Sequence, residues 1–386
     1  MQSLTKRLSH ILLLCGVSTS YIVAQPKSTT ALHGVEFAYP PGIINEFSKA
    51  NGQDGWAREP ILRRMPDGTL LCLHMTGGPW EPNNANYTAV SRSTDNGASW
   101  SSPELLLKHP NQAVYSSELF ISGAQVYNCL ISFYTDSWYS QAKSFTSASQ
   151  NAGKTWTEPM SLPGSLSNFM LKRGFVLSNG DWFFPVACQE KADGFTEVFN
   201  RTTFTQGKHW PFCVSGLICK PGWKEAQLFG YHKRADLGML WEPNAIEVSP
   251  GHLVMLMRAS GTSVLYRTES RDYGRTWTEV GPSDIPNGNS KIMMLKIGKQ
   301  VILVGNQCKD RSEVALWVSD DGCKTWKKKI RLAKIMDMAT MSKIEHNAPM
   351  ICYPDGFADD QQKLLYLALE DGIRHYLLKI PYADFL

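Results

Sequence analysis

The sequence has little of what would place it in several common classes of protein. Its formal net charge of +4 is too small to argue for binding to nucleic acid or to an anionic membrane. Beyond the first 25 residues, no apolar run is long enough to cross a bilayer. No long helical period is present, and no low-complexity linker divides the chain. With 386 residues, 43% of them hydrophobic, the chain can instead bury a large core.

Metal-binding motifs are also missing. Apart from Cys15, the eight cysteines are scattered and form no CxxC pair, so their spacing does not favour zinc. Most of them fall in apolar, strand-like runs, where buried free thiols are expected. Cys213 and Cys219 are a candidate disulfide pair if the compartment is oxidising, with the pairing left open. Isolated histidines such as His74 and His346 are interpreted as structural, and no metal or other cofactor is expected.

The N-terminal segment has the pattern of a signal peptide. Basic residues precede a short apolar run over residues 11–17, and the small residue Ala24 ends the segment. We therefore expect a signal peptide over residues 1–24, a single mature domain over residues 25–386, and a secreted or periplasmic protein. An uncleaved anchor is the alternative. Lipoprotein anchoring is not expected, because the residue before Cys15 is a bulky leucine.

Aromatic residues, by contrast, are plentiful. The chain contains 12 Trp, 14 Tyr and 16 Phe, a supply that suits an all-β protein and also suits stacking against sugar rings. Trp80, Trp138 and Trp241 are candidates for such stacking, although core packing is the alternative for each of them.

Four segments share one pattern, in which Asp or Asn is followed by Gly and then Trp. They are Ser93–Trp100, Ser149–Trp156, Ser270–Trp277 and Ser319–Trp326. The Asp or Asn side chain can accept hydrogen bonds from backbone amides just ahead of it, which makes a tight turn. Glycine supplies the positive φ that such a turn needs, and Cys323 stands in its place in the fourth copy.

The spacing of these turns predicts the fold. Further turn signals such as Pro66-Asp67-Gly68 and Pro354-Asp355-Gly356 alternate with short apolar runs, as in β-hairpins. Counting the units predicts an all-β, six-bladed β-propeller with the last blade closed by a strand from residues 30–50. The expected blades cover residues 55–105, 112–160, 168–225, 238–282, 290–332 and 345–384.

The repeated turn resembles the Asp-box of sialidase-like propellers, and the resemblance to exo-sialidases extends over nearly the whole mature chain. These enzymes hold a substrate carboxylate with three arginines, whose forked guanidinium groups suit both oxygens. Arg58 in Arg58-Glu59-Pro60 is similar to the first, although Glu59 replaces the usual isoleucine. Arg258, sixteen residues after Glu242, is similar to the second, and Arg311, ten residues before Asp321, to the third.

The resemblance also implies a catalytic set. Tyr353 is similar to the family's nucleophile, Glu242 to the glutamate that takes its proton, and Glu81 to the acid/base, which is usually an aspartate. A neutral tyrosine suits an anomeric carbon that carries a carboxylate, because that carboxylate would repel an anionic nucleophile. Each residue also has a structural alternative: Arg58 in a surface ion pair, Arg311 in a charged run, Tyr353 in the core.

The function implied is that of a retaining exo-glycosidase that releases a terminal sialic acid or a related acidic sugar from a glycan. A glycosidase for another ulosonic or uronic acid remains an alternative, since Glu59 and Glu81 depart from the family pattern. A non-catalytic glycan-binding propeller is the third. The partner expected in each case is a glycan or glycoconjugate with an acidic terminal sugar, with no nucleic acid and no stable membrane insertion.

Overall fold

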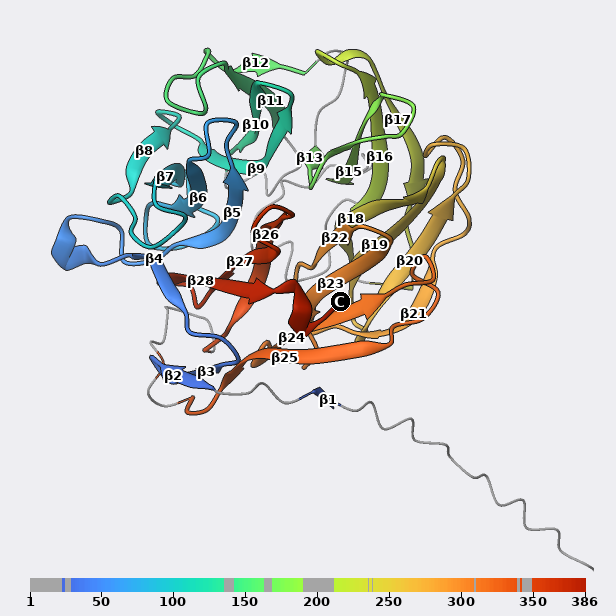
Figure 1. Cartoon of the computed structure of the whole chain (residues 1–386). Helices are drawn as coiled ribbons and strands as arrows, with labels where there is room; N and C mark the ends of the chain where they lie inside the picture. Colours follow the sequence, from blue (N-terminus) through green and yellow to red (C-terminus); the bar gives the residue numbers. More distant parts are fainter. Residues whose placement is uncertain are drawn as a thin grey trace, which may run out of the picture.

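Six sheets arranged around a common axis make up the fold (Figure 1). The computed structural model describes residues 23–24, 29–134, 142–162, 169–189, 212–234, 236–237, 239–308, 310–338, 341 and 349–386. Within these residues, consecutive strands pair in antiparallel hairpins, and each sheet forms one blade. The predicted all-β, six-bladed propeller is therefore confirmed.

The first three blades follow one another along the chain. Blade one contains β5 (Arg58–Arg64), β6 (Leu70–Thr76), β7 (Tyr87–Ser93) and β8 (Glu104–Leu107). Blade two contains β9 (Ala113–Ser122), β10 (Gln125–Phe133), β11 (Lys143–Ser149) and β12 (Met160–Ser161). Blade three contains β13 (Phe169–Leu171), β14 (Phe175–Val176), β15 (Trp182–Gln189), β16 (Phe212–Lys220) and β17 (Lys224–His232).

The other three blades complete the ring. Blade four contains β18 (Met239–Ser249), β19 (His252–Ser260), β20 (Val264–Ser270) and β21 (Gly281–Pro286). Blade five is built on β22 (Met293–Ile297), β23 (Gln300–Asn306), β24 (Glu313–Ser319) and β25 (Lys328–Ile335). Blade six contains β26 (Cys352–Asp359), β27 (Leu364–Glu370), β28 (Arg374–Pro381) and β4 (Gly42–Glu46).

The strand that closes the ring comes from the N-terminal part of the chain, as predicted. β4 pairs with β28, so a strand from the N-terminal part of the chain completes blade six beside the C-terminal strand (Figure 1). Residues ahead of β4 extend blade five instead: β3 (Val35–Phe37) pairs with β25 and with β2 (Thr30–Leu32), and β1 (Val23–Ala24) pairs with β25. Two short 3-10 helices, Lys49–Asn51 and Tyr382–Asp384, complete the described elements. Residues 1–22, most of the expected signal peptide, lie outside the described residues.

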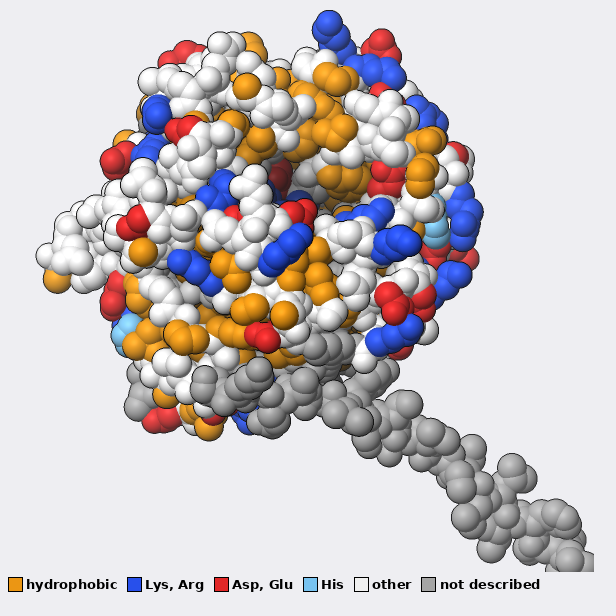
Figure 2. Space-filling model, in the orientation of Figure 1, with side chains coloured by type: hydrophobic (Ala, Val, Ile, Leu, Met, Phe, Trp, Pro, Cys, Tyr) orange, Lys and Arg blue, Asp and Glu red, His pale blue; other side chains and the backbone are white. Residues whose placement is uncertain are grey.

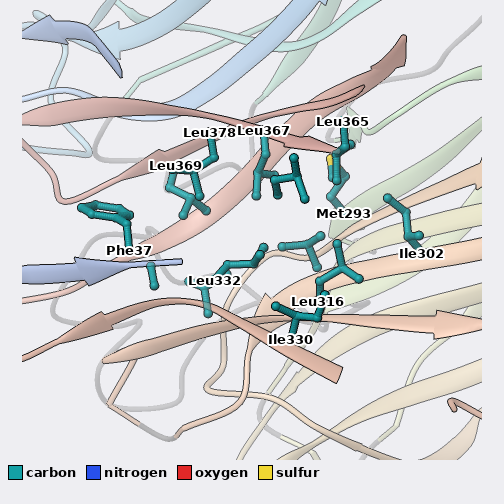
Figure 3. Close-up of a cluster of buried hydrophobic side chains, with 14 of the residues drawn as sticks. Phe37, Met293, Ile302, Leu316, Ile330, Leu332, Leu365, Leu367, Leu369 and Leu378 are labelled. Carbon is teal, nitrogen blue, oxygen red and sulfur yellow. The ribbon is translucent and has the colours of Figure 1, made fainter. Parts of the chain in front are cut away.

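Apolar side chains fill the interfaces between blades. Between blades five and six, Leu316 and Ile330 face Leu365 and Leu367, and all four are at most 3% exposed (Figure 3). The first strand of each blade lies nearest the axis, so that β5 contacts β26 and β18 contacts β22. Because the blades pack through such interfaces, the starts of their inner strands are held close together around the axis. In the described part of the chain, no helix has the length and hydropathy to span a membrane.

The four repeated turns have the hydrogen bonds that their sequence predicts. In the first turn, Asp95 Oδ1 accepts hydrogen bonds from the backbone N–H groups of Ala98 and Ser99 at 3.0 and 2.9 Å. Asp321 does the same in the fourth turn. Cys323 there adopts a φ of 66° and donates its N–H to the Ser319 hydroxyl, as a glycine does in the other copies. The local turn chemistry therefore fixes where the third strand of each of these blades ends.

The candidate disulfide between Cys213 and Cys219 is wrong. Cys213 bonds to Cys188, which lies directly opposite it across the β15–β16 pair with a Cα–Cα distance of 5.2 Å. Cys219 is six residues further along the same strand, and an extended chain of that length separates the two residues by roughly 20 Å. Cys219 is instead a buried free thiol, as are Cys72, Cys129, Cys323 and Cys352.

Candidate active site

Three inner strands begin with the same irregularity. In β5, β18 and β26 a residue with positive φ precedes a proline: Glu59 at 51°, Glu242 at 47° and Tyr353 at 52°. The pairing register shifts at each of these points, as expected for a β-bulge. Bulges re-aim side chains and strained backbone concentrates at functional sites, so the three repeats mark one candidate site.

These side chains line a cavity of about 330 Å³ at the centre of the ring. Figure 2 shows a hollow there, in which acidic and basic side chains meet. The lining residues are Glu59, Glu81, Pro82, Phe212, Met239, Trp241, Glu242, Arg258, Ser260, Asn289 and Tyr353. Four of the six residues singled out in the sequence thus line one cavity, and the other two, Arg58 and Arg311, lie against the Tyr353 ring.

Arg58 is buried and bridges two carboxylates. Its Nε donates to Glu370 Oε1 at 2.6 Å, and its Nη1 donates to Glu81 Oε1 at 2.8 Å. Its guanidinium carbon lies 4.7 Å from the centre of the Tyr353 ring. With only 3% of its surface exposed, Arg58 is not in the surface ion pair that was the alternative for it. Its neighbours Glu370 and Glu81 hold it at the cavity instead.

Arg258 connects Glu242 with Tyr353. Its Nη1 donates to Glu242 Oε2 at 2.6 Å and to the Tyr353 hydroxyl at 3.2 Å. β18 and β19 pair so that Arg258 lies opposite Trp241, next to Glu242 in the chain. The carboxylate and the phenol therefore share one charged donor.

Arg311 approaches the site from the loop between β23 and β24. Its Nη2 donates to the Asn289 carbonyl at 2.5 Å, and its guanidinium carbon lies 5.1 Å from the centre of the Tyr353 ring. Ser260 donates to the Asn289 side chain at 3.2 Å and joins this wall of the cavity to the end of β19. Three arginines from blades one, four and five thus converge on one tyrosine, a concentration of charge suited to an anionic ligand.

Hydrogen bonds of a buried asparagine hold the loop that carries Glu81. Asn86 is fully buried, donates to the carbonyls of Gly77 and Trp80, and accepts hydrogen bonds from Asn83 N–H at 2.7 Å and Tyr115 at 2.8 Å. Trp80 packs against Trp56 at 4.9 Å between ring centres. The loop is therefore a rigid support for the carboxyl group of Glu81.

The surroundings of Glu81 and Tyr353 raise the pKa of both groups. Burial raises the pKa of Glu81 to about 7; Arg58 opposes this shift, while neighbouring carboxylates reinforce it. Burial and then Glu242 raise the pKa of the Tyr353 phenol, against the pull of Arg311, Arg258 and Arg58. A carboxyl group held protonated near neutral pH is what a general acid requires.

Three further charged residues join the site. Lys172 and Lys291 lie 3.7 and 3.8 Å from Glu59 Oε2, and Lys172 also lies 3.9 Å from Glu242. Burial alone would raise the pKa of Glu59, but the two lysines, with Arg58 and Arg258, lower it to about 2. Glu59 is therefore a charged carboxylate in the cavity wall at neutral pH.

The sequence did not identify Glu370, Lys172 or Lys291 as charged residues of the site, and it did not place Glu59 in the pocket. Glu59 could have been found, because Glu59-Pro60 repeats the pattern of Glu242-Pro243 and Tyr353-Pro354. Glu370 and the lysines have no such local signal. Of the aromatic candidates, Trp241 lines the cavity, Trp80 is packed beside it, and Trp138 lies outside the described residues. The described residues contain no cluster of three or more His, Cys, Asp or Glu side chains suited to a metal ion.

Comparison with known families agrees with this architecture. Residues 124–355, more than half of the chain, match the model of the BNR repeat-like domain. The chain belongs to this family. No curated protein matches the sequence of this BNR-repeat protein.

Solved structures with the same fold include sialidases at low sequence identity. The Hadza microbial sialidase Hz136 superposes with a TM-score of 0.67 at 15% identity, covering 87% of this chain and 68% of that one. NanB sialidase from Streptococcus pneumoniae gives a TM-score of 0.63 at 13% identity, covering 90% and 72%.

Trypanosoma rangeli sialidase gives a TM-score of 0.61 at 16% identity, covering 94% of this chain but only 59% of that protein. A Dyadobacter fermentans protein of unknown function gives 0.65 at 14% identity, covering 90% and 100%. The predicted resemblance to the sialidase superfamily is confirmed at the level of the fold. The roles of the individual site residues stay predictions.

Proposed function

We propose that this BNR-repeat protein is a retaining exo-glycosidase that releases a terminal sialic acid or a related acidic sugar from glycans. One observation carries the proposal: Arg58, Arg258 and Arg311 surround Tyr353, whose hydroxyl shares Arg258 Nη1 with Glu242. Such a cluster offers an anionic sugar a carboxylate site directly beside a nucleophile. The structure of Trypanosoma rangeli sialidase with 2,3-difluorosialic acid, a covalent intermediate, adds support from the same fold.

In the first proposed step, the tyrosine displaces the leaving group. The three arginines bind the sugar carboxylate, Glu242 accepts the phenol proton, and the Tyr353 oxygen forms a bond to the anomeric carbon. The bond to the glycosidic oxygen breaks, and this oxygen takes the proton held by Glu81. The sugar is then linked to Tyr353, and Glu81 is ionised.

In the second step, water reverses these roles. The Glu81 carboxylate takes a proton from water, the water oxygen bonds to the anomeric carbon, and the bond to Tyr353 breaks. Tyr353 recovers its proton from Glu242. Two displacements on opposite faces leave the anomeric configuration unchanged, so the reaction retains configuration.

Another acidic sugar is the second candidate substrate, and Glu59 favours it. This carboxylate lines the cavity where the family pattern has isoleucine. A charged acceptor in the wall favours a hydroxyl over an apolar group at the same position of the ligand. The ring substituents that fit here therefore differ from those that fit an apolar wall.

The direct test is a panel of aryl glycosides of sialic acid, other ulosonic acids and uronic acids, with neutral glycosides as controls. Release of aryl alcohol from an acidic member, with a product of retained configuration in NMR spectra, is the expected result. Binding of acidic glycans without any release would favour the non-catalytic alternative. Hydrolysis of neutral glycosides as fast as acidic ones would argue against a carboxylate site.

We also propose that the protein is exported. The basic and apolar N-terminal segment supports this, and so does the Cys188–Cys213 disulfide, which suits an oxidising compartment. N-terminal sequencing of protein from its own host should then begin near Gln25. A chain that keeps Met1 in the cytoplasm would overturn the proposal.

A further inference from the structure

A column of five polar residues lies beside the site, at the seam where blade six closes against blade one. The seam column consists of Asn45, Ser91, His74, His375 and Glu370. His74 and Ser91 belong to blade one, and the other three belong to blade six. The two histidines are almost fully buried, their rings are stacked, and their Nδ1 atoms lie 2.6 Å apart.

The contacts at the two ends of the column determine where its protons lie. Asn45 donates an amide proton to Ser91 Oγ at 3.2 Å, so the Ser91 hydroxyl proton is free to be donated to His74 Nε2 at 3.0 Å. His74 then carries its proton on Nδ1 and donates it to His375 Nδ1. His375 consequently carries its proton on Nε2, which faces Glu370 Oε2 at 4.0 Å.

The opposite assignment is unfavourable. It would direct the bare lone pair of His375 Nε2 at a carboxylate, and it would leave the Ser91 hydroxyl facing two donors. Burial lowers the pKa of both histidines, so a third proton, which would turn one of the two neutral rings into an imidazolium, is also disfavoured. The pair therefore holds one shared proton between its rings and points one N–H towards Glu370.

Glu370 is the link from this column to the site. It is fully buried, accepts from Arg58 Nε at 2.6 Å through one oxygen, and accepts from the Glu59 backbone N–H at 2.5 Å through the other. His375 lies directly opposite Glu370 on the neighbouring strand. Its Nε2 has no hydrogen-bond partner within the described residues, and Glu370 is the acceptor it faces.

We propose that His375, oriented by His74, is a positioning residue for Arg58 and acts through Glu370. At 4.0 Å the N–H of His375 makes no hydrogen bond with Glu370; it acts as a dipole that favours the rotation in which the carboxylate accepts from Arg58 and from the Glu59 backbone. The seam that closes the propeller thus also sets the geometry of its first arginine. The ligand arm of the test below rests on the proposed function; the spectroscopic arm does not.

Two matched substitutions separate this role from simple packing. The side-chain amide of Gln reaches about as far as the imidazole Nε2, whereas that of Asn reaches only about as far as Nδ1. His375→Gln therefore keeps a donor towards Glu370, and His375→Asn loses it while keeping a polar contact with His74. With an aryl glycoside of sialic acid, we expect His375→Asn to raise KM about twofold, at the low end of the scale of one hydrogen bond because the contact is longer than one, and His375→Gln to stay near wild type.

A raised KM with an unchanged kcat distinguishes a positioning role from a purely structural one. Arg58 contacts the ligand before and during the reaction, so loss of its alignment raises KM while kcat stays close to that of the wild type. A purely structural histidine pair would lower the melting temperature in both variants and leave both constants of the folded enzyme unchanged. That pattern, or equal KM values for the two variants, would overturn the proposal.

A spectroscopic measurement tests the coupling without any substrate. In protein labelled with ¹⁵N-histidine, the shared Nδ1 proton should give a resonance far downfield, as short hydrogen bonds do, which disappears in His74→Gln. Arg58→Lys should shift this resonance, because the change reaches the pair through Glu370. An unshifted resonance would contradict the proposal. If no acidic sugar is a substrate but the resonance shifts, the proposed function fails and the positioning role stands.

Discussion

The two ends of strand β5 each carry a buried arginine, and the two arginines differ in how completely they are paired. Arg63, at the end away from the cavity, donates to both oxygens of Glu118 at 2.7 and 3.0 Å, to Asp355 and to the Leu62 carbonyl at 2.8 Å. Arg173 adds a further contact to Asp355 at 3.5 Å. We call Arg63, Arg173, Glu118 and Asp355 the axial cluster.

At the cavity, two arginines are less completely hydrogen-bonded than Arg63. Arg58 Nη2 and Arg258 Nε are buried and have no hydrogen-bond partner among the described residues. A buried donor without a partner costs about 1–3 kcal/mol, and a ligand that supplied an acceptor in the cavity would remove this cost. At the cavity such donors remain available to a ligand, whereas the Arg63 donors that contact Glu118, Asp355 and Leu62 are already used. Tyr353 and Asp355, two residues apart on β26, contact the two different clusters.

Breaking the axial cluster should affect stability rather than chemistry. Asp355→Asn keeps the side-chain volume but leaves Arg63 and Arg173 with one carboxylate fewer, and removing one partner of a buried pair costs about 3–5 kcal/mol. Equilibrium unfolding in urea should show this loss, while the folded variant keeps measurable turnover. As a control, Glu104→Gln removes the charge of an exposed partner of Arg92 and should cost at most about 1 kcal/mol. Equal losses in the two variants would mean that the axial cluster contributes no more than a surface pair.

For Tyr353, two residues from Asp355 on the same strand, we expect a loss of turnover with little loss of stability. Tyr353→Phe removes one hydroxyl that accepts from Arg258 and leaves the ring packing intact. We expect turnover to fall on the order of 10²-fold or more, the scale of a well-placed catalytic group, with little change in melting temperature. Initial rates on an acidic aryl glycoside and a thermal melt check both parts. Near wild-type turnover would show that Tyr353 is structural.

The role of the Arg258 guanidinium can be tested with a substitution that keeps the positive charge but removes its paired N–H donors. Arg258→Lys should weaken binding of an acidic sugar by about 1–3 kcal/mol, because a lysine cannot make two parallel bonds to a carboxylate. Calorimetric titration with free sialic acid and with a uronic acid gives the loss for each ligand. Unchanged affinity for both would place the carboxylate site elsewhere.

The fold was predictable because its signals are local. Each turn of the type Ser93–Trp100 carries its own hydrogen-bond acceptor, its positive-φ position and its tryptophan, so a single sequence suffices to recognise it. The spacing of such turns then counts the blades. The Cys188–Cys213 bond was not predictable in this way, since it depends on which residues face each other across β15 and β16. The number of residues between two cysteines does not show which residues face each other across a pair of strands.

The site was predictable only in part, for a related reason. Arg58, Glu242 and Tyr353 lie in short motifs at the starts of inner strands, where a pattern can be read. Glu370 lies 312 residues from Arg58 and meets it because the ring closes between blades six and one. No local pattern in the sequence reports a contact of that kind. Residues that support the site from across a seam therefore emerge only from the structure.

The last prediction concerns the pH dependence set by Glu81, the carboxyl group that contacts the partly paired Arg58. Its pKa is raised to about 7 from an ordinary value near 4.5, so it is protonated below about pH 7 and loses its proton as the pH rises further. Since a general acid must hold its proton, cleavage of a glycoside with a sugar leaving group should fall about tenfold for each pH unit above 7. An activated aryl glycoside needs little proton donation, so its rate should decline less. In Glu81→Gln, cleavage of the natural type of linkage should be crippled, and the alkaline limb with the aryl substrate should disappear. Parallel pH profiles for both substrates, unchanged in shape by Glu81→Gln, would show that another group supplies the proton.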